Sequence, residues 1–129
     1  MRLWHENLIS KLPRQQLLGQ HRECCALRGL GWGKNHATVN YVFDHSPCKL
    51  YKYHVRVMRE MQRRGYRNDP LWEDPAYRGK SCLPFSELHS YGENENCPIY
   101  PEHDEIYLEE CLENLARKDI FLRSNPNSK

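Results

Sequence analysis

Apolar residues recur at helical spacing in three stretches of the chain, and the clearest stretch covers about residues 46–65. Ser46-Pro47 provides an N-cap followed by a first-turn proline, and Gly65 is a natural helix stop. The apolar face comprises Leu50, Tyr53, His54, Val57, Met58 and Met61. This pattern predicts an amphipathic helix.

Two weaker patterns predict helices at about Leu12 to Arg28 and about His103 to Lys118. In the first, Pro13 suits an early helical position and Gly29 a stop. Gly19 costs about 1 kcal/mol relative to alanine, so it is either tolerated or marks the close approach of another backbone or of DNA. The last stretch has acidic residues early and Arg117-Lys118 late, which agrees with the helix dipole.

The connections between these helices are long. Residues 36–43 have a pattern that suits either an extended or a helical segment, and residues 68–101 are rich in Pro, Gly, Asn and Ser. A chain of 129 residues buries one modest core. The sequence therefore predicts an all-α single compact domain of about three main helices over residues 1–124, with a flexible tail at 125–129.

The hydropathy of the chain excludes two classes of protein. No apolar run approaches the roughly 20 residues that a membrane span requires. The first residues, Met1 to Glu6, lack the apolar core of a secretory signal. We therefore expect a cytoplasmic protein without a membrane partner, and a monomer.

Charge is distributed unevenly along the chain. Residues 1–80 hold 15 Lys and Arg against 7 Asp and Glu, whereas residues 81–129 hold 4 against 10. A basic part interleaved with tyrosine and tryptophan is typical of a nucleic-acid surface, although a solvated helical face gives the same pattern. The six basic residues of the middle helix are candidates for phosphate contacts: Lys49, Lys52, Arg56, Arg59, Arg63 and Arg64.

Six cysteines raise the question of disulfides or zinc. They contain no C-x-x-C pair, and without a secretory signal an even count does not imply a disulfide framework. Most are expected to be buried thiols. A zinc site made of Cys82, His89, Cys97 and His103 is disfavoured because these residues lack close paired spacing.

One stretch, Leu8 to Glu23, places an Arg-Glu pair on the first predicted helix, near the chain's α-amine. An α-amine has a reference pKa of about 7.7–8.0, against about 10.4 for lysine, so a usable fraction of it is neutral near pH 7. Such an amine can form an imine with a sugar carbon, and a nearby carboxylate can stabilise the positive charge that develops.

Four segments together resemble the pyrimidine dimer DNA glycosylase family. They are the amino end through Glu23, His36 to Asp44, Leu50 to Tyr66, and Asp74 to Gly79. The resemblance implies a helical DNA repair glycosylase with abasic-site lyase activity on damaged duplex DNA, which needs no metal or organic cofactor. It fades after Gly79, and it does not identify the lesion.

Carried over by position, the resemblance implies that the α-amine of Met1 is the nucleophile and Glu23 the catalytic carboxylate. Met1 then stands where the family exposes a threonine. Arg2 and Arg22 match arginines of the family and are expected to bind the substrate, and His21 is a further candidate for a DNA contact.

The chain departs from the family at two positions of the first helix. Gln16 replaces a histidine and Ala26 replaces an arginine. Arg14 and Arg28 are expected to compensate as substrate-binding residues. Met1 and Ala26 favour the alternative of a DNA- or RNA-binding protein without catalysis on the same scaffold. A zinc or redox protein built on the cysteines is a third alternative, which is disfavoured.

Overall fold

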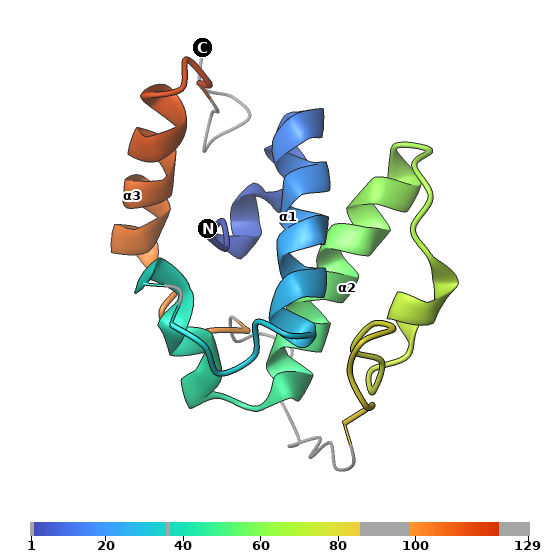
Figure 1. Ribbon diagram of the computed structural model, residues 1–129. Helices are drawn as coiled ribbons and strands as arrows, with labels where there is room; N and C mark the ends of the chain where they lie inside the picture. Colours follow the sequence, from blue (N-terminus) through green and yellow to red (C-terminus); the bar gives the residue numbers. More distant parts are fainter. Residues whose placement is uncertain (1, 36, 86–98, 122–129) are drawn as a thin grey trace.

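The computed structural model describes residues 2–35, 37–85 and 99–121, which form six helical elements (Figure 1). The three α-helices are α1 (Arg14–Arg28), α2 (Pro47–Arg63) and α3 (Glu105–Ala116). Three short 3-10 helices accompany them: η1 (Glu6–Lys11), η2 (Ala37–Asp44) and η3 (Pro70–Glu73). Because the described residues include no strand, the all-α prediction is confirmed. The domain limits stay a prediction, and the tail at 125–129 lies outside the described residues.

The α-helices form where periodicity placed them, and local hydrogen bonds set where they begin. Ser46 caps α2 by accepting from the Cys48 amide at 3.1 Å. The side chain of Asp104 accepts from the Tyr107 amide at 2.9 Å, so α3 begins at Glu105, two residues later than the pattern suggested.

Two glycines end helices for different physical reasons. Gly65 has φ +86°, and the Tyr66 amide then reaches back to the Met61 carbonyl at 2.8 Å, as in a Schellman turn. Gly29 is required by close packing instead, since a Cβ there would lie 2.9 Å from the Arg78 carbonyl oxygen. Gly19 has no backbone of another segment within 4 Å among the described residues, so packing does not require it, and the approach of DNA stays a prediction.

The segment that the sequence left undecided is helical. Ala37–Asp44 forms η2, and Val39 and Val42 on it are fully buried. The long connection after α2 contains one short element, η3, whose N-cap Asp69 accepts from the Leu71 amide. His36 and residues 86–98 lie outside the described part of the chain.

The core lies between α1 and α2, which pack side by side, and the first residues of the chain run between α1 and α3 (Figure 1). Each α-helix and the amino-terminal segment contribute buried apolar side chains, among them Leu3, Leu8, Leu17, Leu27, Leu50, Val57, Cys111 and Leu115. Among the described helices, none has the length and apolar character that crossing a membrane demands.

His103 is a polar residue in this core, and aromatic side chains surround it. It is 2% exposed, its Nε2 lies 2.6 Å from the Tyr41 hydroxyl, and its ring stacks on Tyr107 at 4.9 Å between centroids. Burial, followed by the charge of His5, lowers the pKa of His103 to about 3, although Asp104 opposes the shift. The ring is therefore neutral, and its Nε2 is hydrogen-bonded to the Tyr41 hydroxyl.

We expect the free energy of unfolding to fall as the pH drops from 6.5, the ordinary histidine pKa, towards about 3. The unfolded chain takes up a proton that the buried ring excludes, which contributes up to about 1.4 kcal/mol per pH unit. Urea denaturation at a series of pH values measures this. His103→Gln should be less stable at pH 7 but should show a shallower pH dependence, and an unchanged slope would contradict the assignment.

Candidate active site

The buried side chain of Gln20 joins the start of the chain to α1. Its Oε1 accepts from the Trp4 amide at 2.7 Å and lies 3.0 Å from the Tyr53 hydroxyl. Its Nε2 donates to the Arg2 carbonyl at 3.0 Å and to Glu23 Oε2 at 3.1 Å. One amide therefore holds residues 2–4 beside the carboxylate of Glu23. The sequence analysis did not single out Gln20. Its position about one helical turn before Glu23 is the only feature of the sequence that points to it.

Glu23 is a half-buried carboxylate among positive charges and donors. Burial raises the pKa of Glu23 above its ordinary value. The hydrogen bond from the Arg2 backbone opposes this shift, as do the charge of the amino terminus, the hydrogen bond from Gln20 and the charge of Lys118. An acid in such a setting is able both to stabilise a cation and to take up a proton.

Two cationic side chains that are far apart in the sequence both lie close to the Trp4 ring. Arg2 Cζ lies 6.0 Å from the Trp4 ring centroid, and Lys118 Nζ lies 5.4 Å from it. Arg2 also approaches Glu110 at 3.4 Å. Lys118 stands in the acidic half of the chain, so charge distribution alone gave no reason to place it near Glu23.

The turn after α3 directs Lys118 towards this site. Asp119 has φ +62°, and the Ile120 amide donates to the Leu115 carbonyl at 2.9 Å. A left-handed residue other than glycine is uncommon and costs about 1 kcal/mol or more. This Schellman turn ends α3.

Arg22 and Arg14 are exposed basic residues of α1. Within the described part of the chain, neither has a carboxylate within ion-pair distance. Arg14 lies over the Tyr66 ring at 5.5 Å, in the first turn of the helix. Arg22 precedes Glu23 in the sequence, whereas Arg14 lies more than two helical turns earlier.

The basic face of α2 differs from expectation, because its arginines engage partners within the protein. Arg59 makes a bidentate pair with Glu73 at 2.8 and 3.1 Å, and Arg63 and Arg64 both pair with Glu60. Arg56 lies 3.4 Å from Glu6. These four arginines share three carboxylates, so their charges are only partly compensated, and α2 is not a row of unpaired arginines.

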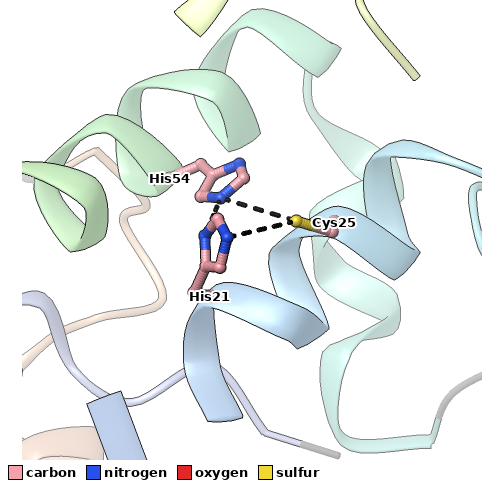
Figure 2. A group of neighbouring side chains, drawn as sticks. All are labelled: His21, Cys25 and His54. Carbon is pink, nitrogen blue, oxygen red and sulfur yellow. Dashed lines mark hydrogen bonds between the residues drawn. The ribbon is translucent and has the colours of Figure 1, made fainter. Parts of the chain in front are cut away.

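His21 does not lie beside Glu23, because residues two apart on a helix point in nearly opposite directions. Its Nδ1 lies 2.8 Å from His54 Nε2 on α2, and its Nε2 lies 3.8 Å from Cys25 Sγ (Figure 2). Burial lowers the pKa of both histidines. These three side chains form a second cluster, which we call the His–Cys cluster.

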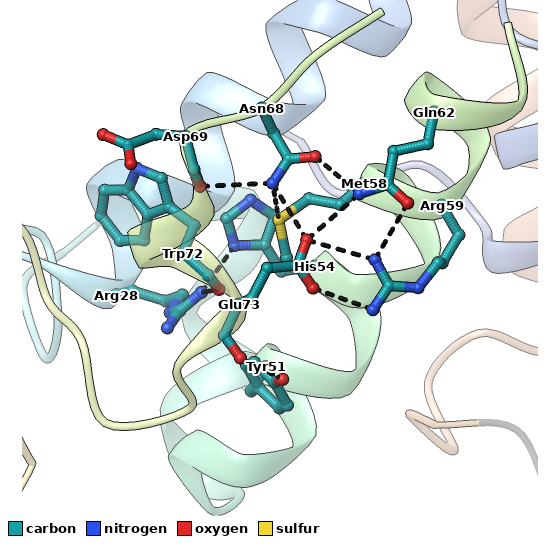
Figure 3. A network of polar contacts seen from close by, with 10 residues as sticks. All are labelled: Arg28, Tyr51, His54, Met58, Arg59, Gln62, Asn68, Asp69, Trp72 and Glu73. Carbon is teal, nitrogen blue, oxygen red and sulfur yellow. Dashed lines mark hydrogen bonds and ion pairs between the residues drawn. The ribbon is translucent and has the colours of Figure 1, made fainter. Parts of the chain in front are cut away.

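Arg28 was expected to contact the substrate, but the structure places it inside the protein, with 1% of its surface exposed. Its guanidinium donates to the carbonyls of Trp72 at 2.9 Å, Asp74 at 2.6 Å and Tyr77 at 2.9 Å. Figure 3 shows it beside His54, whose Nδ1 is 3.0 Å away. Arg28 therefore fixes the 72–77 segment rather than a ligand.

The sequence raised a zinc site of Cys82, His89, Cys97 and His103. His103 does not favour it, because its Nε2 lies 2.6 Å from the Tyr41 hydroxyl. His89 and Cys97 lie outside the described residues. The buried thiol of Cys24 is in the core, in line with the expectation for the first helix, whereas Cys25 faces the two histidines of the His–Cys cluster.

Comparison with known proteins gives one match. A family model described as pyrimidine dimer DNA glycosylase matches residues 1–74, more than half of the chain. No curated protein and no solved structure matches the chain. The match includes Gln20, Glu23 and the His–Cys cluster, but ends before Lys118.

We expect Arg28→Lys to lower the free energy of unfolding by about 2–4 kcal/mol, because an ammonium cannot reproduce the planar donors and leaves buried carbonyls without partners. Thermal or urea denaturation measures the change. Arg22→Lys on the exposed side of α1 is the matched control and should change stability by less than about 0.5 kcal/mol. Equal effects of the two variants would contradict the inward role of Arg28.

Proposed function

The chain belongs to the pyrimidine dimer DNA glycosylase family, and from this premise we propose that it removes a damaged pyrimidine from duplex DNA and then cleaves the abasic strand. In this proposal the α-amine of Met1 is the nucleophile and Glu23 is the catalytic carboxylate. The observation that carries the proposal is the Gln20 side chain, which binds the Arg2 carbonyl and the Glu23 carboxylate at once.

Covalent geometry connects this contact to the α-amine. Only Cα and the carbonyl carbon of Met1 separate its nitrogen from the Arg2 nitrogen, so the two nitrogens lie within about 4 Å in any conformation. The Arg2 backbone in turn hydrogen-bonds Glu23. An unextended amino terminus therefore brings a primary amine to the catalytic carboxylate.

The reaction then needs no group beyond these two. The target nucleotide, or its partner, leaves the base stack, as chemistry on a base requires. The neutral amine attacks C1′, and the bond from C1′ to the base breaks with its electron pair on the base. The C1′–O4′ bond then opens to give an imine, and the two protons lost from the amine balance those taken up by the base and by O4′. Glu23 stabilises the cationic sugar and then removes a proton from C2′, after which β-elimination breaks the C3′–O bond.

We assign the DNA-binding surface to the cations near Glu23. Arg2 and the exposed Lys118 lie beside Trp4, the exposed Arg22 precedes Glu23 on α1, and Arg14 extends the surface towards the start of α1. Phosphates that dock there place the strand against the amine. His21 and Arg28 support this surface from within, since both are engaged by partners inside the protein.

A DNA- or RNA-binding protein without catalysis remains the competing function, because Met1 adds bulk beside the reacting sugar. The bulk obstructs attack but leaves the phosphate contacts intact. The cytoplasmic location and the monomeric state stay predictions.

We expect borohydride to trap a covalent adduct between the untagged protein and a duplex that carries a thymine dimer or an abasic site. Reduction converts the imine to a stable amine, and peptide mapping should locate it on Met1. Glu23→Gln should keep duplex binding and reduce strand cleavage by at least about 100-fold, as expected for loss of a general base.

A version with two glycines added before Met1 is the control for the nucleophile. It should bind the duplex normally and lose the adduct, since the new amine no longer lies at Glu23. Failure of the unextended protein to form an adduct on either duplex, with binding intact, would contradict the enzyme and leave the binding protein.

We expect Lys118→Ala to weaken duplex binding and to reduce the slope of log K against log salt by about 0.9, the value for one phosphate contact. Lys118→Arg should retain both. Arg117→Ala, one residue earlier, is the matched control for general charge and should leave the slope nearly unchanged. Fluorescence anisotropy at several salt concentrations measures these slopes, and equal slopes for Lys118→Ala and the unaltered protein would remove Lys118 from the surface.

A further inference from the structure

Three side chains with metal-ligating atoms converge between α1 and α2. His21 Nδ1 and His54 Nε2 are 2.8 Å apart, and Cys25 Sγ lies 3.9 Å from His54 Nε2. The ligand atoms all lie within 4.8 Å of one another (Figure 2). Two of the residues are one helical turn apart on α1 and the third comes from α2, so two packed helices set their spacing.

We propose that the His–Cys cluster binds a thiophilic metal ion with a filled d shell, Zn²⁺ or Cu⁺. Two imidazole nitrogens and one thiolate are the donors these ions prefer, and the cluster contains no carboxylate of the kind that Mg²⁺, Ca²⁺ or Mn²⁺ select. In a tetrahedral zinc site bond lengths of about 2.0–2.3 Å separate neighbouring ligand atoms by roughly 3.3–3.7 Å, which is within a small side-chain adjustment of the observed spacing.

The cluster is reachable as well as rigid. His54 is fully buried, which fixes its ring, whereas His21 and Cys25 are only half-buried. A rigid inner ligand and two ligands nearer the surface leave a path for the ion. On binding, the Cys25 thiol gives up its proton to solvent, and each imidazole keeps its single proton on the nitrogen that does not bind the ion.

Arg28 determines the state of the cluster without metal. Because a guanidinium only donates, His54 Nδ1 accepts from it at 3.0 Å, and the His54 proton then sits on Nε2 and points at His21 Nδ1. His54 must move that proton to Nδ1 when Nε2 binds a metal. The bond to Arg28 is then lost, but Arg28 keeps its three carbonyl acceptors.

Two properties of the site favour Cu⁺ over Zn²⁺ as the bound ion. The guanidinium charge disfavours a site with net positive charge, so a neutral Cu⁺–thiolate unit is better suited than a Zn²⁺–thiolate unit of charge +1. Cu⁺ also needs no fourth ligand, whereas Zn²⁺ must add water or another group. We therefore expect both ions to bind, with Cu⁺ the tighter.

The test is a titration of the full-length protein with ZnCl₂ in air and with Cu⁺ under anaerobic reducing conditions, each against a competing chelator. One equivalent should bind. Cys25→Ser and His21→Gln should each weaken binding by more than about 100-fold, since loss of a ligand exceeds the 10–100-fold effect of outer-shell changes. Cys48→Ser, a half-buried thiol on α2 outside the cluster, is the matched control and should bind as the unaltered protein does.

Imidazole NMR of the unaltered protein provides a second measurement that does not depend on the folding of a variant. Long-range proton–nitrogen spectra should show His54 protonated at Nε2 without metal and at Nδ1 with metal. A switch of tautomer supports the site. Either an unchanged tautomer in the metal-loaded protein, or metal affinity that is the same in Cys25→Ser and His21→Gln as in the unaltered protein, would overturn the proposal.

Discussion

The buried guanidinium of Arg28 is the constraint on which the rest of the molecule depends. A charge removed from water is costly unless hydrogen bonds replace the water. Here three backbone carbonyls do so, and the rings of Trp72 and Tyr51 lie 4.9 and 5.3 Å from Cζ. The three carbonyls belong to residues 72–77, so the guanidinium ties an irregular segment to α1, and it also contacts His54 Nδ1 on α2 at 3.0 Å.

That constraint explains how a chain with long connections has a fixed site. Arg28 holds the 72–77 segment, Arg78 donates to the carbonyls of Arg28 and Gly29, and Gly29 leaves room for the approach. Arg59 and Glu73 join the same segment to α2 (Figure 3). Several arginines of the front half are thus structural, whereas the exposed Arg14 and Arg22 lie on α1 and the exposed Lys118 lies just after α3.

The sequence was sufficient for elements whose cause is local. The start of α2 follows from Ser46-Pro47, and its end follows from Gly65, because caps and turns act within a few residues. Glu23 could be singled out because the resemblance supplies a role by position. Gln20 and Lys118 could not be singled out, since their contacts join residues 16 to 114 positions apart.

Arg28 shows that tertiary packing also places residues inside the protein that the sequence assigns to the surface. A basic residue at the end of a basic helix predicts a surface contact, and only the packed structure reveals the three carbonyls that draw it inward. His21 was likewise assigned by its neighbours in sequence, whereas its function follows from the face of α1 on which it lies. Helical periodicity predicts that faces exist, but the partner of each face is set by tertiary packing.

α1 consequently has two chemically different sides built from adjacent residues. Gln20 and Glu23 face the amino-terminal segment, while His21 and Cys25 face α2. A rigid helix transmits displacement of one side to the other, since neighbouring side chains share a backbone. Whatever fixes His21 and Cys25 against His54 therefore also fixes the turn that carries Arg22 and Glu23. The His–Cys cluster and the Glu23 carboxylate are in this sense parts of one mechanical unit, although no side chain in the described structure bridges them.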